Sequence, residues 1–216
     1  MYAGFVERAI AVERGKGLEY FTIVYNSAEA LIALVAGAIA GSVALVGFGL
    51  DSLIEVSSGA ALLWRLHHDH DPVHRARAEQ MALRAVGACF LALAAYVTWK
   101  SIECLWSRQA PQRSIPGIIL AATSLVAMPL LARAKRRVAG ILESDAMRAD
   151  ARQTDFCTYL SAILLGGLLL NALLGWWWAD PVAGLVMTPI IANEGIQAMK
   201  GKSCSGSCGC QGEEQL

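Results

Sequence analysis

Six apolar stretches of bilayer length alternate with shorter polar stretches along the chain. The apolar stretches cover residues 20–41, 42–64, 81–104, 115–133, 153–176 and 180–199. A helix needs roughly 20 apolar residues to cross a hydrocarbon core of about 30 Å, and none of these stretches shows the two-residue alternation of a membrane β-strand. We therefore predict an all-α polytopic membrane protein with six transmembrane helices. The first two and the last two spans are expected to form tight antiparallel hairpins, the latter turning at Asp180-Pro181.

The composition agrees with a location in a lipid bilayer. Of the 216 residues, 56% are hydrophobic and only 17% are charged, whereas ordinary soluble domains carry about 25% charged residues. The 18 basic and 18 acidic side chains balance, so no overall basic charge indicates nucleic-acid binding. We expect a transmembrane domain over residues 20–199, a polar cytoplasmic segment over 1–19 and a flexible, Cys-rich cytoplasmic tail over 200–216.

The distribution of basic residues predicts the orientation of the bundle. All but three of the 18 Lys and Arg residues lie in the two terminal segments or around the second-to-third and fourth-to-fifth connections. The three exceptions, Lys100, Arg108 and Arg113, fall on the opposite side. Because cytoplasmic loops carry an excess of Lys and Arg, both termini are expected in the cytoplasm, most simply at a bacterial inner (plasma) membrane.

Two carboxylates lie within the second apolar stretch. Asp51 is nine residues from Ser42, about 13 Å along a helix and so near the midplane of the bilayer. Glu55 follows four residues later on the same helix face. Two ionised carboxylates at this depth would repel each other, and a divalent cation relieves that repulsion. The pair therefore predicts a cation site, although a protonated or water-bridged pair that tunes helix packing is an alternative.

Two further polar residues share a face of the first span. Asn26 and Glu29 are three residues apart. Glu29 either lines the same cavity or hydrogen-bonds to a neighbouring helix, and we expect Asn26 to act as a structural bridge. Both are secondary candidates for the cavity.

The start of the fifth span carries a mixed set of polar side chains. At helical spacing, one face presents Asp150, Gln153, Thr154 and Cys157, while Asp155 points elsewhere. A thiolate is a softer ligand than oxygen and favours zinc over magnesium or calcium. The alternative is that Cys157 is simply a small buried apolar residue.

Two outlying clusters are secondary metal candidates. All four histidines lie in or next to the connection between the second and third spans, where His70 and His74 are four residues apart. Imidazole and carboxylate groups at this density suit a loose zinc site, although a solvated polar loop is an alternative. In the tail, Cys204, Cys208 and Cys210 could bind a soft cation, unless the tail is inert.

These motifs resemble the cation diffusion facilitator (cation efflux) family. Residues 41–55 are similar to its second span, and residues 149–151 and 178–183 are similar to its fifth-span entry and its turn into the sixth span. The resemblance covers residues 20–199 and implies a homodimeric bundle of six helices. It also implies export of zinc or a similar divalent ion in exchange for protons, with no enzymatic activity and no permanently bound cofactor.

The resemblance also assigns ligands, with two departures. The family site takes two ligands from the second span, here Asp51 and Glu55, and a His-x-x-x-Asp pair from the fifth, which here falls on Gln153 and Cys157. Either Asp150 also contributes, or the site has three protein ligands and water. Residues 200–216 are too few for the cytoplasmic domain that family members usually carry, so we expect the short form of the family.

The expected mechanism is alternating access, in which protons arriving from outside compete for the deprotonated ligands and release the metal. The rival interpretation is a membrane metal sensor or scaffold that binds ions without transporting them.

Overall fold

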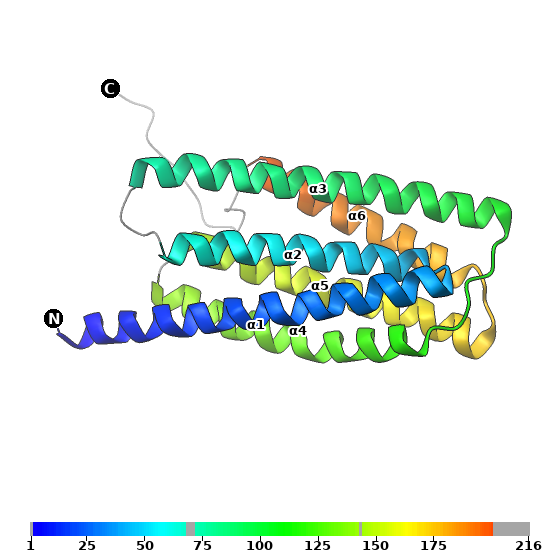
Figure 1. Ribbon diagram of the computed structural model, residues 1–216, viewed down its shortest axis with the longest axis horizontal. Coiled ribbons are helices and arrows are strands. Elements are labelled where there is room, and N and C mark those ends of the chain that lie inside the picture. Colours follow the sequence, from blue (N-terminus) through cyan, green and yellow to red (C-terminus); the bar gives the residue numbers. More distant parts are fainter. Residues whose placement is uncertain (1, 68–71, 143, 201–216) are drawn as a thin grey trace, which may run out of the picture.

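The computed structural model describes residues 2–67, 72–142 and 144–200, with side chains described over 10–63, 84–142, 150–200 and at 144, 147 and 148. These residues form helices α1 (Tyr2–Ala40), α2 (Val43–His67), α3 (Pro72–Ser107), α4 (Ile115–Leu142), α5 (Asp145–Leu174) and α6 (Ala179–Met199). The helices run roughly side by side in an elongated bundle (Figure 1). No strand occurs over the described ranges, so the all-α prediction is confirmed.

The outer surface of the bundle is apolar enough for a lipid environment. Five of the described helices contain stretches long and apolar enough to cross a membrane: Ile10–Ala40, Val43–Leu63, Arg84–Ser107, Ile115–Leu142 and Asp150–Leu174. Large apolar side chains such as Val24, Leu31 and Ile39 point outward. Helix α6 packs against α3 and α5 within the same bundle. The protein is therefore a polytopic helical membrane protein.

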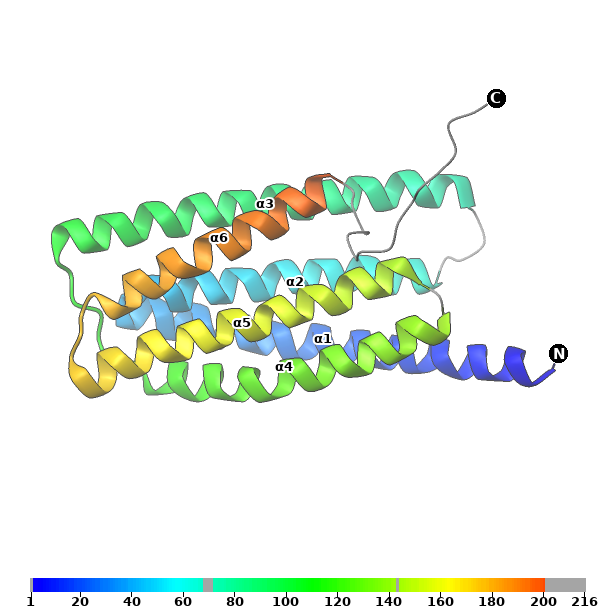
Figure 2. The same ribbon diagram turned by 180° about the vertical axis from the view of Figure 1, so that it is seen from behind.

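Helix α2 lies at the centre of the bundle and contacts α1, α3, α5 and α6. Three pairs of helices make the most extensive contacts, namely α1 with α2, α4 with α5, and α3 with α6. The view from behind shows α4, α5 and α6 in front of α1, α2 and α3, so that α5 lies across from α2 (Figure 2). This central position explains why the polar residues of α2 are shielded from lipid.

The two tight hairpins are present, but the second turn lies earlier than predicted. Between α1 and α2, Gly41 adopts a positive φ of 66°, which glycine tolerates at little cost. Between α5 and α6, the corresponding residue is Gly175, with a φ of 67°. Asp180 belongs to the first turn of α6 and does not form the turn itself. Its carboxylate instead accepts hydrogen bonds from the backbone N–H of Val43, at 2.9 Å, and from the hydroxyl of Ser42.

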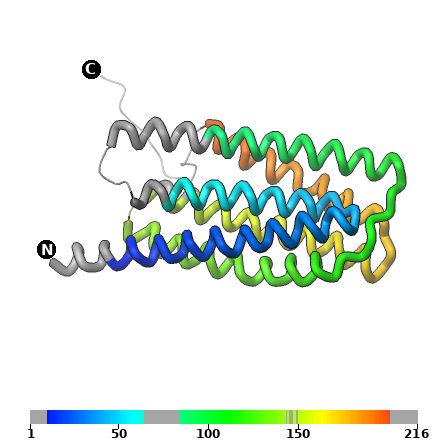
Figure 3. Tube along the Cα trace, in the orientation of Figure 1, coloured from blue at the N-terminus to red at the C-terminus, as the bar shows by residue number. Residues whose placement is uncertain are grey.

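Four helices extend by eight residues or more beyond the predicted spans at the end of the bundle where α1 begins (Figure 1). The Cα trace shows α4 running to this end of the bundle (Figure 3). Helix α1 starts at residue 2 where the span was predicted from 20, α3 at 72 where 81 was predicted, and α5 at 145 where 153 was predicted. Helix α4 ends at 142, not at 133. The predicted spans end where charged residues begin, because they are defined by hydropathy. Ala, Arg, Glu and Lys nevertheless favour helix, so the helices continue past the apolar stretches.

Candidate cation site

The α2 carboxylates are buried in the centre of the bundle. Asp51 is 4% exposed and Glu55 is 3% exposed. The amide Nδ2 of Asn26 on α1 donates a hydrogen bond of 2.7 Å to Oε2 of Glu55. Oε1 of Glu55 is also buried, and none of the described groups donates to it. Because buried polar atoms are nearly always partnered, this oxygen faces a position suited to a ligand, a water molecule or a proton.

The polar face of α5 is turned toward the interior. All four of its predicted members are buried: Asp150, Gln153, Thr154 and Cys157. Asp155 pairs instead with Arg136 near the surface of the bundle. The thiol of Cys157 interacts electrostatically with Glu55, Glu29 and Asp51. The α5 thiol and the α2 carboxylates therefore belong to one polar region between the two helices.

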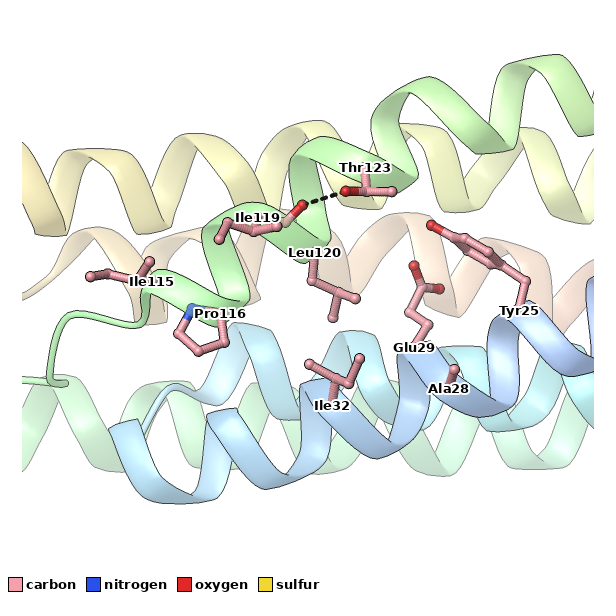
Figure 4. A pocket seen from close by; sticks show the side chains of 9 residues that line it. All are labelled: Tyr25, Ala28, Glu29, Ile32, Ile115, Pro116, Ile119, Leu120 and Thr123. Atoms are coloured by element: carbon pink, nitrogen blue, oxygen red, sulfur yellow. Dashed lines mark hydrogen bonds between the residues drawn. The ribbon is translucent and has the colours of Figure 1, made fainter.

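Glu29 is hydrogen-bonded to two neighbouring helices. It accepts a hydrogen bond of 2.8 Å from Ser52 on α2 and another from Ser124 on α4. The hydroxyls of Ser124 and Tyr25 are 2.9 Å apart. Glu29 and Tyr25 also line a pocket of about 510 Å³ between α1 and α4, which is otherwise mostly apolar (Figure 4). Glu29 thus hydrogen-bonds to neighbouring helices, which is one of the two roles that the sequence left open, and the pocket that it borders is not lined by Asp51, Glu55 or Cys157.

A buried ion cluster of Glu19, Lys135 and Asp150 links α1, α4 and α5. Nζ of Lys135 lies 3.2 Å from Oε2 of Glu19 and also donates to the carboxylate of Asp150. Lys135 and Glu19 are both 0% exposed, although the sequence places them in a basic connection and a polar terminal segment. The helical spacing does give a signal for the burial of Lys135. This residue lies seven positions after Met128 and four after Leu131, so it shares a helix face with these two buried residues.

Other buried polar atoms without a hydrogen-bond partner, which we call orphan atoms, lie mostly around the same region. Among the residues whose side chains are described, six buried polar atoms lack a hydrogen-bond partner, on Glu19, Asn26, Glu55, Ser101, Gln153 and Glu194. Glu194 of α6, which sequence reasoning missed, interacts electrostatically with Asp51. Buried orphan groups are rare in folded proteins and need an explanation, so their concentration here indicates a site for a polar ligand or for ordered water.

The candidate ligands are not gathered around a single point. Over the described part of the chain, no group of three or more His, Cys, Asp or Glu side chains forms a ready-made metal site. Binding by Asp51, Glu55 and Cys157 together would therefore require side chains or helices to shift. His70, Cys204, Cys208 and Cys210 lie outside the described residues, and His74 lies in the first turn of α3 with its side chain outside them.

A helical membrane bundle that buries carboxylates, an amide and a thiol along two facing helices has the character of a membrane cation transporter. Residues 20–200 match the cation efflux transmembrane domain. The chain therefore belongs to the cation efflux family, which confirms the family resemblance seen in the sequence.

Two relatives support this assignment. The chain is 26% identical over 189 residues to Transmembrane protein 163 of Xenopus laevis, covering 84% of this chain and 65% of that protein. It is 27% identical over 176 residues to the Uncharacterized transporter sll1263 of Synechocystis sp., covering 77% of this chain and 56% of that protein. The matches thus span less than two thirds of each relative's length.

Proposed function

We propose that this protein exports a divalent transition-metal cation, zinc in particular, from the cytoplasm in exchange for protons. The observation that carries the proposal is the orphan Oε1 of Glu55, buried on α2 near Asp51 and within electrostatic reach of the Cys157 thiol on α5. Membership of the cation efflux family supports the same activity.

The chemistry of the donors favours zinc as the substrate. Zinc accepts sulfur, nitrogen and oxygen ligands in a four-coordinate arrangement, whereas magnesium and calcium prefer oxygen ligands alone. Asp51, Glu55 and Cys157 supply two oxygen donors and one sulfur donor, and water completes the set. Gln153 is a weaker donor, and Asp150 is held by Lys135.

Proton exchange follows from the same ligands. Carboxylates and thiolates bind a metal only when they are deprotonated, so protons that reach the site from outside displace the metal and reset the transporter. The absence of a ready-made metal site over the described residues fits a carrier whose ligands converge only in part of its cycle.

The setting of the protein is part of the proposal. The basic residues that favour the cytoplasmic side lie mainly around the two terminal segments and the second-to-third and fourth-to-fifth connections, which supports our proposal that both termini lie in the cytoplasm and that the membrane is a bacterial plasma membrane. The homodimer that the family resemblance implies belongs to the same proposal and is tested by cross-linking in the membrane.

Zinc flux into proteoliposomes tests the transport assignment. Asp51→Asn keeps the shape of the side chain but removes its charge, so we expect zinc flux and the coupled proton flux to be lost while zinc-independent folding is kept. Asp155→Asn is the matched control, because Asp155 lies on the surface-facing side of α5. Undiminished flux in Asp51→Asn would overturn the proposal, and zinc binding without flux in the unmodified protein would favour a sensor or scaffold.

A further inference from the structure

The buried ion cluster of Glu19, Lys135 and Asp150 joins three helices through one ammonium group. Lys135 contributes its Nζ from α4, Glu19 a carboxylate from α1, and Asp150 a carboxylate from α5. A lysine is almost never fully buried unless it is paired, and here it neutralises one of two carboxylate charges. Oε1 of Glu19 is buried without a partner among the described groups, so the cluster keeps unsatisfied acceptor capacity.

The cluster lies between the candidate site and the end of the bundle where α1 begins. Glu19 precedes Asn26 by seven residues on α1, and Asp150 precedes Cys157 by seven on α5, which is two helical turns or about 10 Å in each case. On α2, a Cβ atom at Gly59 would lie 3.3 Å from Oε2 of Glu19. Gly59 is one turn beyond Glu55 in the same direction, so four helices converge at this level.

We propose that Glu19, Lys135 and Asp150 form the inner gate of the transport path. The Lys135 ammonium closes the path by holding the carboxylates of α1 and α5 together. An incoming divalent cation competes with Lys135 for these same two carboxylates, so the gate opens when the cation takes the place of the ammonium. The cation then passes on to Glu55.

That the gate faces the cytoplasm rests on the proposed function. The existence of the gate is tested without measuring flux. Cys157 is buried two turns beyond the cluster and reports whether the path is open. In a chain whose other five cysteines are replaced by serine, a membrane-impermeant maleimide is applied separately to each side of the membrane. The variants are Lys135→Met, which removes the charge, and Lys135→Arg, which keeps it.

The matched control is Arg136→Met, which breaks the neighbouring ion pair between α4 and α5 at the bundle surface. We expect Lys135→Met to label Cys157 about tenfold faster or more, and only from the side that carries the termini. Lys135→Arg and Arg136→Met should label as slowly as the parent. Unchanged labelling in Lys135→Met would overturn the gate, as would labelling from both sides, because general loosening of the bundle exposes the thiol to both.

Lys135→Met leaves two buried carboxylates without a counter-charge, which favours misfolding. A second variant therefore tests the gate without this imbalance of charge. The triple variant Glu19→Gln, Lys135→Met, Asp150→Asn removes all three charges at once, and we expect the same one-sided labelling from it. Slow labelling in this folded variant would overturn the gate. If the gate variants label as expected but Asp51→Asn still transports zinc, the gate stands and the assignment of the site fails.

Discussion

Replacing Asn26 by alanine removes the hydrogen bond that holds the Glu55 carboxylate. Asn26 Nδ2 donates to Oε2 of Glu55 at 2.7 Å, which leaves Oε1 directed away from this bond and without a described partner. In our account, Asn26 orients the carboxylate so that Oε1 is free for the metal. The loss of the Asn26 side chain should therefore weaken cation binding without removing any of the proposed metal ligands.

The size of the effect follows from the type of hydrogen bond. A hydrogen bond to a charged group contributes about 1.5–3 kcal/mol, and about 1.4 kcal/mol corresponds to a tenfold change in affinity. Residues that orient metal ligands typically change affinity by about 10- to 100-fold when they are replaced. We therefore expect the half-saturating zinc concentration for flux to rise by about 10- to 100-fold in Asn26→Ala, with the maximal rate largely kept.

The assay is zinc uptake into proteoliposomes over a range of zinc concentrations. Asn193→Ala is the matched control, because Asn193 is an exposed asparagine of α6 and its loss should leave the curve unchanged. If Asn26→Ala folds and saturates at the zinc concentration of the parent, Asn26 does not orient a ligand and the assignment of Glu55 Oε1 as a metal ligand is wrong.

Three other variants test separate parts of the account. Cys157→Ser removes the soft donor, so zinc and cadmium flux should fall much more than manganese flux; a parallel fall for all three ions would exclude sulfur ligation. Asp180→Ala removes the acceptor for Ser42 and for the start of α2, so thermal unfolding in detergent should show a loss of about 1–3 kcal/mol, and an unchanged Tm would refute the anchoring role. Glu29→Gln keeps the shape but weakens acceptance from Ser52, so Tm should fall while maximal flux is kept; abolished flux in a folded Glu29→Gln would instead place Glu29 in the transport path.

The helices and the faces of their polar residues could be predicted from the sequence. In a bilayer the backbone must satisfy its own hydrogen bonds, so a long apolar stretch becomes a helix and its periodicity gives the face. The spacing of Asp51 and Glu55 therefore predicts a buried pair on α2, and the spacing of Asp150 and Cys157 predicts a shared face of α5.

The partners between helices could not be predicted in the same way. Lys135 and Glu19 are 116 residues apart, and Ser42 and Asp180 are 138 apart, so spacing within one helix says nothing about their contact. Lys135 also stands beside the exposed residues Arg133, Arg136 and Arg137, which made it look like part of a solvated basic run. Only the packing of α4 against α1 and α5 distinguishes the buried lysine from its neighbours.

X-ray absorption spectroscopy of the zinc-loaded protein tests the central claim most directly. In a variant whose tail residues Cys204, Cys208 and Cys210 are replaced by serine, we expect one sulfur scatterer at about 2.3 Å from zinc together with oxygen scatterers at about 2.0–2.2 Å. The sulfur contribution should disappear in Cys157→Ser, and zinc binding should be lost in Asp51→Asn. A zinc spectrum with no sulfur contribution, or one unaffected by Cys157→Ser, would contradict a cation bound between α2 and α5.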